Sequence, residues 1–341
     1  MTDIEKTVEF NSKTCLANEC ESDFLRKLRL IPCLGIFLGW FSAVCYATAT
    51  FTVELMEDVD PTFVVFARSI IQLLFFLIPI LYNKDSILGH PEERYQMFER
   101  SFFTFISFLL SFVALDYISF SDSQSIIFAS PVITSIMGYF ILKESCGITH
   151  VIVLVATVVG VFSISRPVFI FGVTDQEDVF TPEERTIGLI ICIITCLLTG
   201  YVYITMRKLQ KTSSTANVGG YSLFCVLAAS LVMNMYSFIT GSMIRIPGNS
   251  RDWILVIING LIGIVGQLCS AMAVRIEEAG LVSIMRSFDI VMAFMYQAAF
   301  LNQPIHWTSI MGALVISSGC IVVSSVKYYE SKAKKAVREN E

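Results

Sequence analysis

The chain has 341 residues, of which 55% are hydrophobic and 16% are charged. Its mean hydropathy of +0.68 leaves little room for a soluble fold, so the composition predicts a membrane protein. The formal net charge of −5 identifies no partner, and we expect no nucleic-acid ligand.

Ten apolar stretches are each long enough to cross a bilayer, whose hydrocarbon core of about 30 Å needs roughly 20 apolar residues in a helix. They lack the alternation of a barrel strand, which predicts an all-α polytopic membrane protein. The expected spans are 31–52, 61–82, 101–119, 124–142, 148–165, 186–206, 218–242, 252–273, 280–301 and 305–327.

The spans fall as five plus five around an acidic loop at 166–185. If the second five repeat the first, an odd number per half makes them enter the membrane from the opposite side, as in inverted-repeat transporters. The predicted organisation is a tail at 1–29, a five-helix repeat at 30–165, the loop at 166–185, a second repeat at 186–327 and a tail at 328–341.

Lysine and arginine are unevenly shared between the loops. Eighteen of the 24 cations fall in the two tails and in alternate loops, counting Arg100 and Arg275 as loop residues. Since cytoplasmic loops are enriched in these residues, both termini are predicted to be cytoplasmic. The sequence does not select a particular membrane.

The sequence contains no motif that indicates a metal site, a cofactor site or an enzyme active site. Six of the ten cysteines lie inside predicted spans and are expected to be small core residues. His90, His150 and His306 are far apart, so we predict no metal site and no cofactor. No HExxH, GxSxG, GxxxxGKS or GxGxxG string is present, and we expect no enzyme activity.

Three ionisable residues lie deep inside predicted spans: Arg68 in the second, and Arg286 and Asp289 in the ninth. Each costs about 2.5–3.5 kcal/mol at a helix centre, which predicts that they face a cavity or one another. At 1.5 Å per residue they lie about 10, 9 and 13 Å from the nearer membrane face, around the midplane where carriers bind substrate. Arg286 and Asp289 could instead neutralise each other at i, i+3, and Arg68 could cap buried carbonyls.

Two further features interrupt regular helices. Ser130-Pro131 lies in the middle of the fourth span, where proline removes a helical hydrogen bond and either frees a carbonyl for a ligand or makes a packing kink. Gly260, Gly263 and Gly266 form a bare face on the eighth span, for close packing or for hinge motion. An offset of 158 residues aligns Ser130-Pro131 with Phe288-Asp289, with weak identity overall.

These residues resemble the drug/metabolite transporter superfamily with tandem EamA-type repeats, and within it the G-type members of solute carrier family 35. The resemblance runs from about residue 31 to 327. The matching strings are Ser121-Asp122-Ser123, Phe128-Ala129-Ser130-Pro131-Val132-Ile133-Thr134, Lys143-Glu144, Arg166 to Gly172, Gly266-Gln267, Ile276-Glu277-Glu278-Ala279-Gly280, Asp289 to Gln297, and Trp307-Thr308.

The resemblance implies a ten-helix carrier with cytoplasmic termini and a cavity enclosed by helices one to four and six to nine. The G-type branch looks like carriers of small organic anions, whereas the wider family 35 moves nucleotide sugars. Arg68 matches the family's second-helix arginine, and Arg286 a basic position of its ninth helix. The chain departs from the family where serines flank Asp122, where Val168 replaces a proline, and where Asn302-Gln303 stands opposite Lys143-Glu144.

The sequence therefore predicts a secondary active transporter of a small polar, anionic, carboxylate-like metabolite. Arg68 and Arg286 would attract the anion, Asp289 would couple a proton or counter-ion, and further hydrogen bonds are expected from Gln267, Gln297, Tyr46, Tyr117 and Ser130. The alternatives are a nucleotide-sugar carrier, a channel, or a non-transporting scaffold that binds other membrane proteins.

Overall fold

The computed structural model describes residues 34–56, 59–118, 120–144, 147–165, 181–241, 244–300 and 307–339, in which all regular structure is helical. Ten helical spans in these residues are long and apolar enough to cross a membrane. The first half contains α2 (Leu34–Glu54), α3 (Pro61–Asn83), η1 (Pro91–Glu93) with α4 (Arg94–Ala114), α5 (Phe120–Ile127) with α6 (Ser130–Met137) and η2 (Gly138–Leu142), and α7 (Ile148–Ser165). The second half contains α9 (Pro182–Lys208), α10 (Ser214–Thr240), α11 (Ser250–Ile276), α12 (Ala279–Arg286) with α13 (Phe288–Phe300), and α14 (Trp307–Glu339).

Local sequence signals fix several helix ends. Asp60 precedes Pro61 and accepts a 2.9 Å hydrogen bond from the Thr62 backbone N–H at the start of α3. Thr181 and Glu184 form a capping box at the start of α9. Gly241 ends α10 with a φ of 66°, a left-handed conformation that glycine adopts without a steric penalty.

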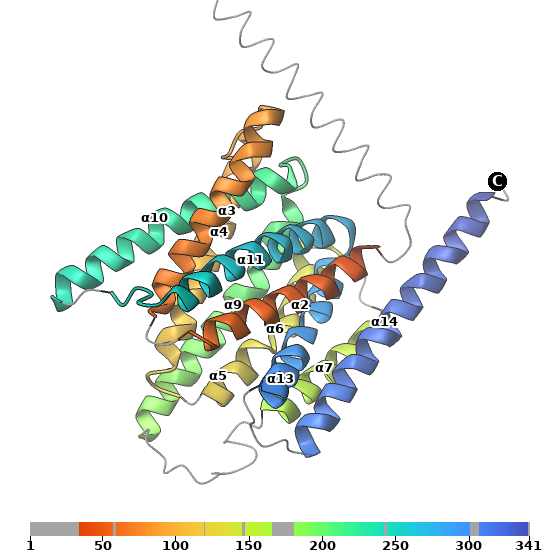
Figure 1. Ribbon diagram of the computed structural model, residues 1–341. Helices are drawn as coiled ribbons and strands as arrows, with labels where there is room; N and C mark the ends of the chain where they lie inside the picture. The colour runs from red at the N-terminus through yellow and green to blue at the C-terminus, as the bar shows by residue number, and fades with distance from the viewer. Residues whose placement is uncertain are drawn as a thin grey trace, which may run out of the picture.

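The helices pack in the pattern expected of two inverted repeats. α2 lies along α11 (Figure 1), and α4 packs along α9. Exchanging the two repeats converts one of these pairs into the other. The pairs α3–α10, α6–α12 and α7–α14 each join a helix to its own counterpart. Such a pattern requires a pseudo-two-fold axis through the bundle, so the all-α inverted-repeat prediction is confirmed.

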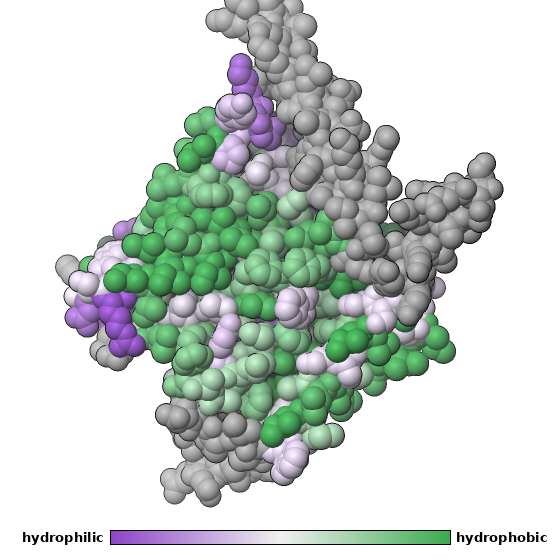
Figure 2. All heavy atoms as spheres, turned by 45° about the vertical axis from the view of Figure 1, so that its right-hand side comes forward, coloured by the Kyte–Doolittle hydropathy of each residue, from purple (hydrophilic) through white to green (hydrophobic). Residues whose placement is uncertain are grey.

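The two ends of the bundle differ in their connections. The segments 84–93, 143–144, 209–213 and 277–278 meet at one end, which we call the basic end because it carries Lys84, Lys143 and Lys211. In Figure 2 a broad hydrophobic area covers the face shown, and strongly hydrophilic residues gather at its margins. This distribution suits helices whose middle portions face lipid.

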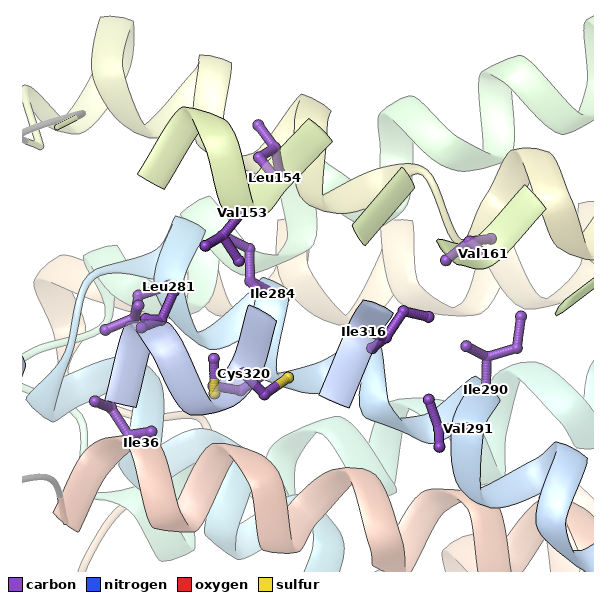
Figure 3. Packing of buried hydrophobic residues seen from close by; sticks show 12 residues of the cluster. Ile36, Val153, Leu154, Val161, Leu281, Ile284, Ile290, Val291, Ile316 and Cys320 are labelled. Carbon is purple, nitrogen blue, oxygen red and sulfur yellow. The ribbon is translucent and has the colours of Figure 1, made fainter. Parts of the chain in front are cut away.

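The largest buried cluster joins both repeats. Figure 3 shows aliphatic side chains of α7 meeting those of α12, α13 and α14, with Ile36 of α2 at one side. Its buried members are Ile36, Val153, Leu154, Val161, Leu281, Ile284, Met285, Ile290, Val291, Ile316, Cys320 and Val323. The cluster holds α7 and α14 against the broken ninth span.

Three span boundaries differ from the sequence prediction. The third span covers Pro91–Ala114 instead of 101–119, because its polar first turns are helical and turn Met97 and Arg100 inward. The sixth begins at Pro182 within the predicted acidic loop. The last helix continues to Glu339, beyond the predicted end at 327.

Candidate functional site

The fourth and ninth spans are both broken near their middle. α5 ends at Ile127 and α6 starts at Ser130, with Pro131 in the first turn of α6. α12 ends at Arg286 and α13 starts at Phe288, although no proline is present there. α6 and α12 pack together, and Ser130 and Ser287 are buried, so both breaks lie in the interior of the bundle.

Arg286 lies at the break of the ninth span and contacts residues from two helices. Its guanidinium carbon is 3.8 Å from the centre of the Tyr46 ring on α2, and its Nη2 is 3.5 Å from the Asp289 carboxylate. Both charged side chains are mostly buried, at 20% and 11% exposed. The long distance makes this a weak ion pair, and Nε of Arg286 has no hydrogen-bond partner, so Asp289 satisfies the arginine incompletely.

Arg68 lies on α3 against the glycine face of α11. A β-carbon added at Gly263 would be 2.7 Å from Nε2 of Gln72 and 3.3 Å from Cδ of Arg68, so both side chains use the space that this glycine leaves. Gly260 leaves space for Ile71 in the same way, which shows that the face packs closely. Within the described residues Arg68 makes no ion pair, and Nε2 of Gln72 has no acceptor.

Arg100 is a third deep arginine, so the predicted loop position of this residue is wrong. It is 2% exposed, and its Nη1 donates to the backbone oxygen of Asn217 at 3.0 Å and to its Oδ1 at 2.5 Å. Its guanidinium carbon lies 5.0 Å from the centre of the Tyr221 ring. A usable sequence signal was the helical spacing of Met97, Arg100 and Ser101, which places Arg100 on the buried face of the extended helix.

Tyr46 of α2 interacts electrostatically with all three deep arginines, and directly with Arg286. These arginines come from three helices: Arg286 from α12, Arg68 from α3 and Arg100 from α4. Asp289 is the only carboxylate that interacts with this group among the described residues. Three cations and one carboxylate make the centre of the bundle strongly attractive to an anion, since buried charges require a partner.

Of the four other predicted site residues, two are buried in the bundle, one lies away from the arginines, and the side chain of one is outside the described residues. Ser130 is buried at the start of α6, and Gln267 is buried on α11, one turn after Gly263. Tyr117 lies after α4 against Gly188, which is about 22 Å along α9 from Tyr203, so it does not join the arginines. Gln297 is on α13, but its side chain lies outside the described residues.

Ten spans in an inverted repeat, with two broken helices around buried charges, define a membrane transporter. The chain belongs to the EamA-like transporter family, whose pattern matches residues 33–166 and 186–325. This confirms the predicted drug/metabolite transporter class with tandem repeats, and members of this class are transporters and not enzymes.

Individual relatives agree with this assignment. Solute carrier family 35 member G1 of Mus musculus is 30% identical over 294 residues, covering 86% of this chain and 77% of the relative. The human protein of the same name is 27% identical over 322 residues, covering 93% and 87%. The pseudopaline exporter CntI of Pseudomonas aeruginosa is 20% identical over 287 residues, covering 82% and 94%. A crystal structure that is 13% identical, with a TM-score of 0.72 and coverage of 87% of this chain and 98% of the other, shares the fold.

Proposed function

We propose that this protein is a secondary active transporter of a small anionic metabolite that works by alternating access. The observation that supports this most strongly is the excess of buried positive charge: Arg68 and Arg100 make no ion pair within the described part of the chain, and Arg286 has only a weak one. A bound carboxylate or similar oxyanion would supply the missing counter-charge.

The remaining polar groups fit separate roles around the arginines. Arg286 and Tyr46 would hold one face of the anion, while Ser130 and Gln267 would donate hydrogen bonds from α6 and α11. Asp289 would be the site of proton coupling, because it is the carboxylate next to the substrate cations. The positive end of the α13 helix dipole also points toward the break.

The test is uptake into proteoliposomes from a panel of labelled solutes. The panel contains mono-, di- and tricarboxylates, sugar phosphates and nucleotide sugars, with glucose and lysine as neutral and cationic controls. We expect saturable uptake of anions alone, and a loss of at least about tenfold in kcat/KM for Arg68→Gln, Arg100→Gln and Arg286→Gln, equivalent to about 1.4 kcal/mol or more.

Arg94→Gln is the matched control. Arg94 is exposed and lies less than two turns before Arg100 on the same helix, so its replacement removes one charge without changing the buried group. We expect this variant to transport like the wild type. Uptake that depends equally on all four arginines, or not on any of them, contradicts the proposal, while uptake of nucleotide sugars alone would favour that alternative.

We further propose that both termini are cytoplasmic, which makes the basic end the cytoplasmic one. The distribution of lysine and arginine supports this orientation. Epitope tags at both chain ends should be accessible only after the plasma membrane is permeabilised or from the cytosolic side of isolated vesicles. Tags found on opposite sides would contradict it.

A further inference from the structure

Glu144, which follows the fourth span at the basic end, connects the first repeat to three helices of the second. Its carboxylate accepts a hydrogen bond from Nε of Arg207 on α9 at 3.1 Å. It also accepts from the backbone N–H of Ala279, the first residue of α12, at 3.2 and 3.0 Å. Nη1 of Arg207 donates in turn to the carbonyls of Val274 and Arg275, near the end of α11.

The local backbone is shaped for this carboxylate. The fourth span ends in the π-helical turn η2, and Lys143 takes a left-handed φ of 54°. A β-carbon added at Gly138 would be 3.1 Å from Oε2 of Glu144, so the glycine leaves room for the carboxylate to reach Ala279. The negative charge also lies at the positive end of the α12 dipole.

Two short helices meet next to this contact. α6 with η2 covers 130–142, α12 covers 279–286, and a non-helical residue or loop flanks each at both ends. Gly280 of α12 packs on Ser135 of α6, where an added β-carbon would be 3.4 Å from Cβ of Ser135. Short helices between two breaks can move as rigid units, because the breaks absorb the change in backbone angles.

α12 carries the Glu144 contact at its first residue and the site arginine at its last. Ala279 and Arg286 are seven residues apart, or about 10 Å along the helix. On α9, Tyr203 lies within electrostatic range of Arg286, and Arg207 binds Glu144 one turn further on. A movement of α12 that breaks the contact with Glu144 therefore also moves Arg286 relative to Tyr46.

We infer that Glu144 and Arg207 form the gate at the basic end of the carrier, and that α12 is the lever that couples this gate to Arg286. The gate is closed in this structure. A second carboxylate, Glu93, holds segment 209–213 through four hydrogen bonds and stays in place when the gate opens, because α4 and α9 pack along much of their length. The inference rests on the transporter fold and not on the charge of the substrate.

The gate can be tested by thiol accessibility. Ser135 is buried and its hydroxyl has no hydrogen-bond partner, so Ser135→Cys replaces it without losing a bond. In the S135C background we expect Glu144→Gln and Arg207→Gln each to increase the labelling rate of the new thiol by a membrane-impermeant maleimide at least about fivefold. The double variant should exceed either single variant only slightly, because both changes break the same contact.

Two controls separate gate opening from other effects. Glu92→Gln removes a charge from the same end by breaking the exposed Glu92–Lys211 ion pair, and we expect no change in labelling. Native Cys192 is fully buried beside Ser123, away from the gate, and should stay unlabelled in every variant, as peptide mass spectrometry would show. Equal labelling of E144Q and E92Q, or joint labelling of Cys192, would overturn the inference.

A disulfide supplies an independent test of the movement. In the Ser135→Cys and Gly280→Cys pair the added β-carbon at 280 would be 3.4 Å from Cβ of residue 135, just under the roughly 3.5–4.5 Å of disulfides, so a small shift of α12 lets the bond form. Oxidation of this double variant should abolish uptake of any solute that the wild type carries from the panel, and reduction should restore it, whereas either single variant should be insensitive. Undiminished uptake by the oxidised protein overturns the gate, whereas a wild type that carries no anion counts against the proposed substrate and leaves the labelling test intact.

Discussion

Replacing Glu93 should destabilise the carrier much more than replacing its neighbour Glu92. Glu93 is 7% exposed, and its two carboxylate oxygens accept hydrogen bonds from the backbone N–H groups of Gln210, Lys211 and Thr212 and from the Thr212 hydroxyl, at 2.7–3.1 Å. These bonds fasten the start of the third span to the segment that joins α9 and α10. Glu93→Gln removes the charge and turns one acceptor into a donor.

The magnitude follows from the number of bonds. Hydrogen bonds to a charged group contribute about 1.5–3 kcal/mol each and neutral ones about 0.5–1.5 kcal/mol. In Glu93→Gln two bonds weaken to the neutral value, one N–H donor of Thr212 loses its acceptor, and the Thr212 hydroxyl can rotate to accept from the new amide. These changes together predict a loss of about 4–7 kcal/mol, which should lower the apparent Tm by roughly ten degrees or more.

Thermal unfolding of purified protein in one detergent measures this difference. Glu92 interacts with the Lys211 side chain on the exposed surface, so Glu92→Gln should leave Tm unchanged. The comparison removes the same charge from adjacent positions of one segment. Equal Tm values for the two variants would show that the Glu93 hydrogen bonds do not hold the repeats together, and the reasoning would fail.

Other changes have different expected outcomes. Gly312→Ala places a β-carbon 2.5 Å from the carbonyl oxygen of Gly160, so α7 and α14 must separate. The free energy of unfolding should fall by about 1–3 kcal/mol, as is typical of overpacking, and a lower Tm would show this. Tyr46→Leu removes the ring under Arg286, so KM for the transported anion should rise in proteoliposome uptake, and the loss of one cation–π contact should lower the free energy of unfolding by about 1–2 kcal/mol and with it Tm. Burial raises the pKa of Glu144 above its usual range, with Glu278 adding to the shift and Arg207 opposing it, so the carboxylate takes up a proton in milder acid than an exposed glutamate. Because acid also lowers the thiolate fraction that a maleimide attacks, S135C is compared with S135C/E144Q at each pH. Acidification should reduce the difference in labelling rate between the two, since protonation of Glu144 weakens the same contact that Glu144→Gln weakens.

Much of the fold was predictable because the apolar spans and the odd number per repeat depend only on composition and spacing. The break in the fourth span follows from Pro131, a local signal. The break at Ser287 was not predicted, because no proline or glycine marks it in the sequence. The periodicity of a sequence indicates which residues share one face of a helix, but not which residues of other helices pack against that face.

The site was predictable in part for the same reason. Arg68, Arg286 and Asp289 are conspicuous because each interrupts a long apolar run. Arg100 was missed because polar neighbours surround it in the sequence, although Asn217 and Tyr221 from α10 enclose its side chain in the fold. The contact between Glu144 and Ala279 joins residues that are 135 positions apart, and no local pattern predicts it.

The exchange of partners between the repeats means that neither half of the chain can bury its own interior. α2 needs α11, as Nδ2 of Asn259 shows by donating to the Ala49 carbonyl at 2.7 Å and to the Thr52 hydroxyl at 2.9 Å, and α4 needs α9. Either half synthesised by itself would expose these surfaces to lipid. The two halves should regain a stable bundle when they are produced together as separate polypeptides, and two copies of one half should not, because Arg68 and the glycine face of α11 that accommodates it come from different halves of the molecule.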